Sequence, residues 1–182
     1  MAINCYISND LLLDCKSAVG GLRSVHILGG SGNTITDYAA NVDGEITSIS
    51  GTGTMYKVEI TRGSSSYEEP LAVNGETNSL SFAPQLNLQI PKLDTVNRNF
   101  FESLASQPFI YVVIETMDKK YWLLGKDNGL TVSEGTLQSG LAATDLVGFT
   151  LTLVGQEATA SSLIDADAST IASIFSGITW NA

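Results

Sequence analysis

Short runs of alternating apolar and polar residues, separated by clusters of Gly, Ser, Asn and Pro, make up most of this chain. Such alternation is typical of β-strands that bury one face. The clearest run covers 149–156, with Phe149, Leu151 and Leu153 on one face and threonines on the other. The same pattern predicts strands over residues 3–8, 24–28, 45–50, 55–61, 66–73, 77–90, 109–116, 120–125 and 129–137. We therefore expect a mainly β fold, either a β-sandwich or a β-barrel.

Glycine and proline mark where these runs turn or break. Gly51-Thr52-Gly53 predicts a hairpin between two strands, and Asn74-Gly75 is a strong signal for a type I′ turn. Pro70 and Pro84 lie inside strand patterns, where they predict an edge position or a local break.

One amphipathic helix interrupts the strands, at about 93–106. Its apolar residues recur at three- and four-residue steps, and we expect them to face the sheet; they are Leu93, Val96, Phe100 and Leu104. Asp94 or Thr95 can cap its start, and Pro108 prevents its continuation.

The C-terminal residues have a different pattern. Residues 158–162 are small and polar, as in a linker, and the following apolar positions fit a short amphipathic helix that Gly177 ends. We therefore divide the chain into a β domain over 1–157 and a C-terminal extension over 158–182, made of a short helix and an arm.

The charge of the chain is strongly acidic. Its 182 residues include 9 Lys and Arg against 19 Asp and Glu, a formal net charge of -10. Binding to nucleic acid phosphates or to anionic lipid depends on clustered Lys and Arg, so this charge disfavours both. No basic residue precedes Lys16, and the longest uncharged apolar run, 109–114, is far shorter than a membrane helix. We expect a protein made in a reducing cytoplasm, without membrane association.

Reactive side chains are scarce. His26 is the one histidine, and we expect it to be a partly buried, hydrogen-bonded side chain in a strand. Cys5 and Cys15 are expected to be reduced, small apolar residues. The sequence has no zinc-ligand spacing, nucleophile-elbow motif, Walker A loop or complete dinucleotide-binding motif. We expect no enzyme activity, no cofactor and no metal.

Two further groups of residues invite a functional interpretation, but each has a simpler one. Glu115 and Asp118 flank a predicted hairpin tip, which favours a solvated turn. Tyr121, Trp122 and Trp180 are too scattered for a sugar-binding platform, so core packing is the better interpretation.

Several stretches resemble a family of phage structural proteins. They are VGGL at 19–22, YWLLGKDNGL at 121–130, SEGT at 133–136 and DLVGFTLTL at 145–153. Together with the order of several strands, one helix, a hairpin and two strands, they are similar to tail tube and related ring proteins of Bacteroidetes-infecting phages, crAss-like phages included. The likeness covers about 3–157, and its motifs are turns and strand patterns.

This resemblance implies a tail-tube type of fold and a structural role in the virion. The chain would assemble with copies of itself into rings, hexameric by family likeness, contact other virion proteins and let phage DNA pass without binding it. Assembly would take place in the cytoplasm of the host bacterium. Two alternatives stay open: another virion ring, head–tail or auxiliary capsid protein, and a non-catalytic extracellular β-sandwich binding module.

The resemblance also implies which residues serve assembly. In tail tubes a long loop or hairpin at this place reaches a neighbouring subunit or ring, so we expect contacts from Ser64, Ser65, Ser66, Tyr67, Pro70, Asn74 and Gly75. In the resembling proteins, the strands of this part usually face the bore. The resemblance therefore implies that four acids line the lumen, and these are Glu45, Glu59, Glu68 and Glu69.

Overall fold

The computed structural model describes residues 19–142 and 144–181. The predicted strand at 3–8 and both cysteines lie outside the described residues. The described part is mainly β, as the alternation predicts, with strands β1 (Leu22–Gly29), β2 (Thr34–Ala40), β3 (Ile46–Glu59), β4 (Ser66–Glu68), β5 (Leu71–Asn74), β6 (Ser79–Phe82), β7 (Gln85–Pro91), β8 (Ile110–Thr116), β9 (Tyr121–Leu124), β10 (Leu130–Gln138), β11 (Gly148–Gly155), β12 (Ser162–Ile164) and β13 (Phe175–Trp180). The helices are α1 (Thr95–Ala105) and α2 (Ile171–Ile174).

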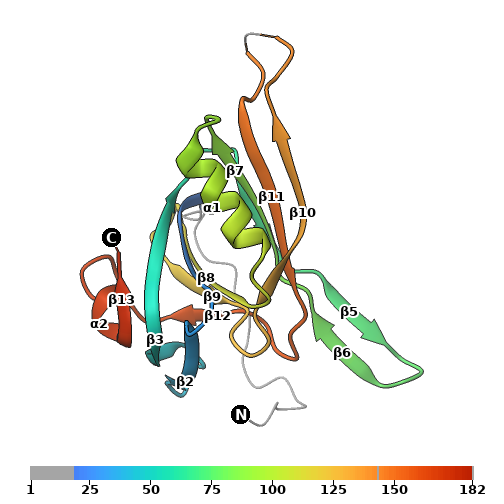
Figure 1. Cartoon of the computed structure of the whole chain (residues 1–182). Coiled ribbons are helices and arrows are strands. Elements are labelled where there is room, and N and C mark those ends of the chain that lie inside the picture. The colour runs from blue at the N-terminus through green and yellow to red at the C-terminus, as the bar shows by residue number, and fades with distance from the viewer. Residues whose placement is uncertain (1–18, 143, 182) are drawn as a thin grey trace.

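Eleven of these strands form one strongly curled sheet (Figure 1). Its order is β1-β3-β12-β9-β8-β10-β11-β7-β4, while β2 and β13 also pair with β3 and β1 also pairs with β8. The sheet therefore curls back on itself around β1, β3, β9 and β8. Since β12 meets β3 through one residue pair, Ile164 with Ile46, and β4 ends the order at an edge, the fold is sandwich- and barrel-like but not a closed barrel.

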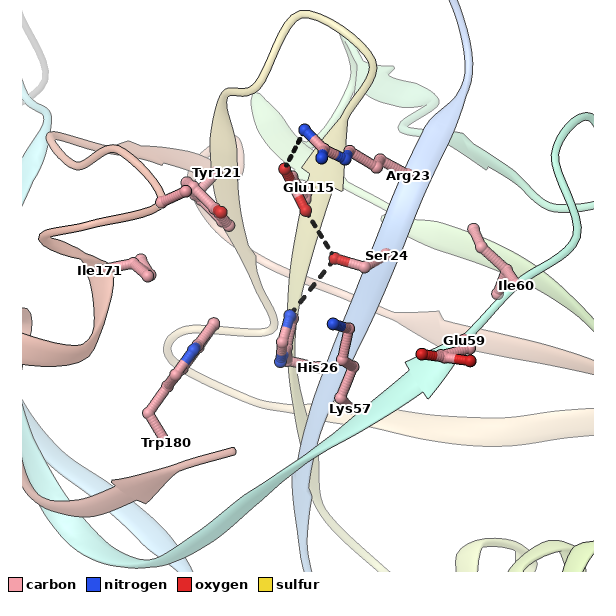
Figure 2. A pocket seen from close by; sticks show the side chains of 11 residues that line it. Arg23, Ser24, His26, Lys57, Glu59, Ile60, Glu115, Tyr121, Ile171 and Trp180 are labelled. Atoms are coloured by element: carbon pink, nitrogen blue, oxygen red, sulfur yellow. Dashed lines mark hydrogen bonds and ion pairs between the residues drawn. The ribbon is translucent and has the colours of Figure 1, made fainter. Parts of the chain in front are cut away.

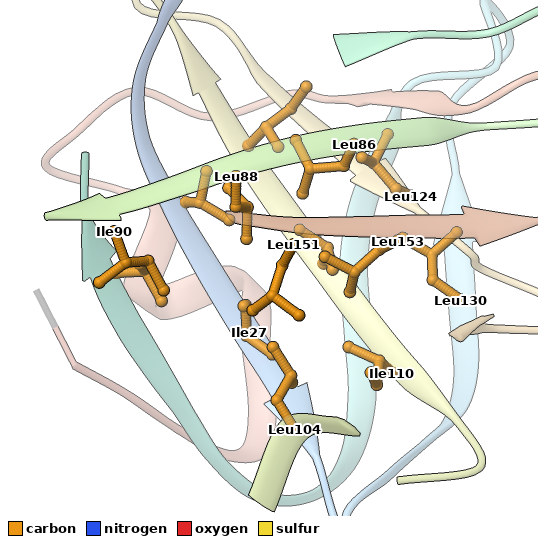
Figure 3. Close-up of a cluster of buried hydrophobic side chains, with 14 of the residues drawn as sticks. Ile27, Leu86, Leu88, Ile90, Leu104, Ile110, Leu124, Leu130, Leu151 and Leu153 are labelled. Carbon is orange, nitrogen blue, oxygen red and sulfur yellow. The ribbon is translucent and has the colours of Figure 1, made fainter. Parts of the chain in front are cut away.

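The curled sheet encloses two hydrophobic clusters. The first lies between β1, β8, β7, β11 and α1, and Figure 3 shows its leucines and isoleucines meeting between these elements. The second lies between β3, β9, β12, α2 and β13. Strand β8 contributes Val112 to the first cluster and Val113 to the second. A strand buried on both faces needs apolar residues at successive positions, which explains the continuous apolar run at 109–114.

Helix α1 begins and ends close to the predicted bounds. The Asp94 side chain caps it by accepting a hydrogen bond from the Asn97 N–H at 2.8 Å. Leu104 is buried and Phe100 packs on the first cluster, as predicted, but Val96 is 75% exposed and Leu93 is also on the surface. The predicted apolar face is therefore wrong at its N-terminal end, where α1 extends beyond the sheet core. Phe101 packs on the cluster in their place, with its ring 5.1 Å from that of Phe149.

The hairpin predicted at Gly51-Thr52-Gly53 is wrong, because β3 runs through these residues without a turn. Both glycines are sites where another part of the chain approaches β3 closely. A Cβ on Gly51 would lie 2.2 Å from the carbonyl oxygen of Thr34 in β2. Gly53 has a φ of +121°, and a Cβ there would lie 2.3 Å from Asn33. Glycine inside a strand allows this approach and so looks like a turn in the sequence.

The residues predicted to form a C-terminal arm belong to the main sheet. β12 pairs with β9, and β13 lies parallel to β3 from Phe175 opposite Ile49 to Trp180 opposite Met55. The predicted helix is only the single turn α2, and its predicted end at Gly177 is wrong, because Gly177 lies inside β13. Strand β13 carries Phe175 and Ile178 into the second cluster.

Candidate functional site

A two-stranded hairpin of β5 and β6 projects from the body of the protein (Figure 1). It forms a sheet of its own, because the chain breaks its strands at Pro70 and at Pro84, as predicted. At its base the Ala83 N–H donates to the Pro70 carbonyl at 2.9 Å. Phe82 and Glu157 exchange two backbone hydrogen bonds of 2.8 Å, which fix the base to the body.

The two faces of this hairpin differ in chemistry. Leu71 lies opposite Phe82 and Val73 opposite Leu80. Opposed residues in an antiparallel pair share a face, and so do alternate residues of one strand. These four apolar side chains therefore line one face, while Ala72, Asn74, Ser79 and Ser81 line the other. Leu71, Val73 and Leu80 are 55%, 68% and 44% exposed, so the apolar face is open to solvent among the described residues.

The turn of the hairpin is longer than predicted. The prediction of a type I′ turn at Asn74-Gly75 is wrong, because residues 75–78 form a four-residue connection. The residue with positive φ in this connection is Asn78, at +52°. The Asn74 side-chain oxygen accepts hydrogen bonds from the N–H groups of Glu76 and Thr77, at 3.0 and 3.4 Å. An Asx turn thus replaces the tight two-residue turn.

The predicted contact residues fall in two places. Pro70, Asn74 and Gly75 lie on the hairpin, but Ser64 to Tyr67 belong to the body. Ser65 is buried, and its hydroxyl accepts a hydrogen bond from the Gln89 N–H at 3.2 Å. Tyr67 pairs with Leu86 of β7 and packs on the first cluster. Sequence reasoning also missed the apolar face, although its signal, alternation on both sides of Asn74-Gly75, is present in the chain.

Two acids hold the base of the hairpin. The Glu69 carboxylate accepts hydrogen bonds from the Ser161 N–H at 3.1 Å, from the Ser161 hydroxyl at 3.1 Å and from the Tyr67 hydroxyl at 2.7 Å. Glu157 is buried, and its carboxylate accepts a hydrogen bond from the Asn128 N–H at 3.0 Å. Burial raises the pKa of the Glu157 carboxyl above its ordinary value. Glu69 therefore has a structural role, tying the start of the hairpin to the segment before β12.

The four predicted lumen acids lie in three separate places. Glu45 precedes β3 and accepts a hydrogen bond from the Asn41 side chain at 3.1 Å, while Glu59 is exposed at the other end of β3. A strand of this length spans up to ~45 Å. Glu68 is exposed at the end of β4, beside Glu69. The acids of one chain do not form a single cluster.

A polar pocket of about 400 Å³ lies between β1, β8, the end of β3 and the C-terminal residues (Figure 2). The Ser24 hydroxyl donates to Glu115 Oε2 at 2.8 Å and lies 3.3 Å from His26 Nε2. Arg23 forms an ion pair with Glu115 at 3.2 Å. The solvated turn predicted for Glu115 is wrong, since Glu115 is the last inward residue of β8 and is only 7% exposed.

The direction of the hydrogen bonds among Glu115, Ser24 and His26 decides whether the histidine can act as a base. Because the Ser24 proton goes to Glu115, the His26 Nε2–H must donate to Ser24, and the imidazole does not act as a base toward the hydroxyl. Ser24 and His26 are 4% and 3% exposed. Burial, together with the charge of Lys57, lowers the pKa of His26 to about 4, so the ring is neutral at pH 7. The network joins β1 to β8.

Tyr121, Trp122 and Trp180, the aromatic residues weighed for a sugar-binding platform, serve core packing. Trp180 stacks on His26 and on Phe175, with ring centroids 4.1 and 5.0 Å apart. Tyr121 is in the second cluster, and Trp122 packs on the first. They form no exposed platform.

Within residues 19–142 and 144–181, no group of three or more His, Cys, Asp and Glu side chains is placed to hold a metal ion. In the same part of the chain, neither helix has the length and apolar character needed to cross a membrane. No protein family, curated protein or solved structure matches this chain.

Proposed function

We propose that this protein is a structural subunit that assembles with copies of itself into rings, and that these rings build the tail tube of a phage virion. The observation that supports self-assembly is the apolar face of the β5–β6 hairpin. A two-stranded hairpin in water is marginally stable by itself, and an exposed apolar face marks an interaction surface. The hairpin needs a partner, and every copy of the chain carries the same hairpin.

An acidic conduit for DNA is the second part of the proposal. The net charge of -10 is repeated in each subunit, so any acid that faces the bore becomes a ring of like charge. Screening limits this repulsion to roughly 10 Å at 0.1 M salt, so only residues at the bore surface keep DNA from sticking. Glu59 and Glu68 are exposed and can serve in this way, whereas the Glu69 carboxylate is engaged by Ser161 and Tyr67.

The test is electron microscopy and sedimentation velocity on the purified protein and on Val73→Ser/Leu80→Ser. We expect rings or stacked tubes with an open centre for the original chain. The double variant removes half of the apolar face and should sediment as a monomer with an unchanged melting temperature, because the hairpin lies outside the main sheet.

Ala72→Ser, on the opposite face of the hairpin, is the matched control and should assemble normally. A chain that stays monomeric at high concentration and with virion partners present would overturn the proposal. Normal rings from the double variant would show that the hairpin is not what assembles them.

A further inference from the structure

The chain contains two Asn-Gly pairs, Asn74-Gly75 and Asn128-Gly129. An asparagine before glycine can react with its own backbone, because the next backbone nitrogen reaches the side-chain carbonyl carbon by closing one small ring. Glycine favours this reaction, since it has no side chain to shield that nitrogen and its backbone adopts many conformations. The two pairs share this chemistry, so their surroundings in the fold decide whether each one reacts.

The pair at Asn74-Gly75 is open to reaction. Both residues are exposed, at the end of β5 and at the start of the connection to β6. Among the described residues, no hydrogen bond engages the Gly75 N–H, and nothing lies within 4 Å of the place that a Cβ on Gly75 would take. The Gly75 nitrogen is therefore available as the attacking group.

The side-chain carbonyl of Asn74 is polarised by its neighbours. Its Oδ1 accepts hydrogen bonds from the N–H groups of Glu76 at 3.0 Å and of Thr77 at 3.4 Å. Negative charge develops on this oxygen when the Gly75 nitrogen adds to the side-chain carbon. N–H groups that already point at such an oxygen stabilise that charge, as the donors of an oxyanion hole do. The Asx turn thus favours attack on Asn74.

The pair at Asn128-Gly129 has the opposite arrangement. The Gly129 N–H, which would have to attack, is buried and donates to the Gly125 carbonyl at 3.0 Å. The Asn128 amide nitrogen, which would have to leave, donates to the Gln156 carbonyl at 2.7 Å. The Asn128 N–H also donates to the Glu157 carboxylate at 3.0 Å. Reaction would require these hydrogen bonds to break, so the fold protects Asn128.

We propose that Asn74 is a site of spontaneous self-modification, at which the folded chain converts asparagine to aspartate and isoaspartate. The Gly75 nitrogen forms a bond to the Asn74 Cγ, the Cγ–Nδ2 bond breaks, and ammonia leaves with the proton that the Gly75 nitrogen loses. Water then opens the cyclic imide. Opening at one carbonyl gives aspartate, and opening at the other gives isoaspartate, in which the main chain runs through the former side chain.

The place of this modification matters for the hairpin. Isoaspartate puts an additional carbon atom into the main chain at the end of β5, directly beside the pairing of Val73 with Leu80. Strand pairing depends on regular main-chain spacing, and a two-stranded hairpin has little stability to spare. The apolar face of the hairpin therefore loses its order as copies are converted. Loss of assembly in aged, unassembled copies is the one consequence that rests on the proposed function.

The test compares the two pairs in the folded and in the unfolded chain. The purified protein is aged in mildly alkaline buffer with and without guanidinium chloride, and mass spectrometry of its peptides measures the conversion of each asparagine. Labelling by an isoaspartyl methyltransferase identifies the isoaspartate. We expect similar rates for Asn74 and Asn128 in the unfolded chain, and conversion at least about tenfold faster at Asn74 in the folded chain. Equal rates at the two sites of the folded chain would overturn the proposal.

Gly75→Ala tests the role of the attacking nitrogen. A Cβ fits at this position, so the melting temperature should stay the same while the methyl group shields the nitrogen. Conversion of Asn74 should fall at least about tenfold. Ser81→Ala, on the same hairpin, is the matched control and should convert like the original chain. Unchanged conversion in folded Gly75→Ala would also overturn the proposal.

Sedimentation velocity on the aged proteins tests the consequence for assembly. The original chain should lose assembly in proportion to its isoaspartate content, and Gly75→Ala should keep it. Equal losses in the two proteins would show that the modification does not affect the assembly contact. A chain that never assembles would remove the proposed function, while the peptide measurements would still decide whether Asn74 modifies itself.

Discussion

At the scale of single residues, the neutral His26 in the polar pocket makes stability depend on pH. The unfolded chain takes up this proton with a pKa near 6.5 and the folded chain only near 4. The free energy of unfolding is therefore not lowered by His26 above pH 6.5, where the ring is neutral in both states. It falls as the pH drops from 6.5 toward 4, because the unfolded chain then binds a proton that the folded chain does not. Between pH 7 and pH 5 we expect the free energy of unfolding to fall by about 2 kcal/mol from this group.

Urea unfolding at several pH values measures this effect. His26→Gln keeps a side-chain N–H for Ser24 but has no group that titrates, so its stability should change less over the same range. The carboxylates titrate in both proteins and cancel in the comparison. Equal slopes for the two proteins would mean that His26 is accessible to protons in the folded state.

At the scale of elements, Gly51 in the middle of β3 allows β2 and β13 to approach β3 closely. Because Gly51 has no Cβ, there is room for the Thr34 carbonyl of β2. Gly177 of β13 lies against the carbonyl of Gly51 itself. Gly51→Ala should cost about 1–3 kcal/mol of stability, because backbone must move to admit the methyl group. Gly75→Ala is the control, since nothing lies within 4 Å of a Cβ there. Thermal melts compare the two, and a Gly51→Ala protein as stable as the control would mean that β2 separates from β3 easily.

The elements that the sequence predicts well are those with local causes. Alternation over 149–156 depends on one buried face, and the start of α1 depends on the Asp94 side chain beside it. The elements that the sequence predicts wrongly depend on contacts with residues far away along the chain. Gly51 resembles a turn until Thr34 is placed against it, and Glu115 resembles a solvated residue until Arg23 and Ser24 arrive from β1. The projecting hairpin is intermediate: its prolines and its Asn mark it locally, while its separation from the main sheet depends on tertiary structure.

At the scale of the whole molecule, the C-terminal residues complete the second hydrophobic cluster. Ile171, Ile174, Phe175 and Ile178 are all buried there, and β13 is bonded along β3. A chain that ends at Ser169 should lose cooperative unfolding and bind a hydrophobic dye, because its second cluster is left open. Circular dichroism melts and dye fluorescence measure this, with a chain ending at Trp180 as the control. A shortened chain that melts cooperatively near the original temperature would show that the fold forms without α2 and β13.

The pairing of β13 with β3 also sets the order of events during synthesis. Phe175 finds Ile49 roughly 125 residues away along the chain, and closing so large a loop is slow. While the ribosome is still adding β10 and β11, β3 has already emerged but lacks β13, the strand that pairs along one of its edges. The growing chain must therefore keep Ile46, Ile49 and Met55 from other contacts until β13 has been synthesised. Completion of the fold, and with it any assembly that depends on the folded body, is timed by the synthesis of β13.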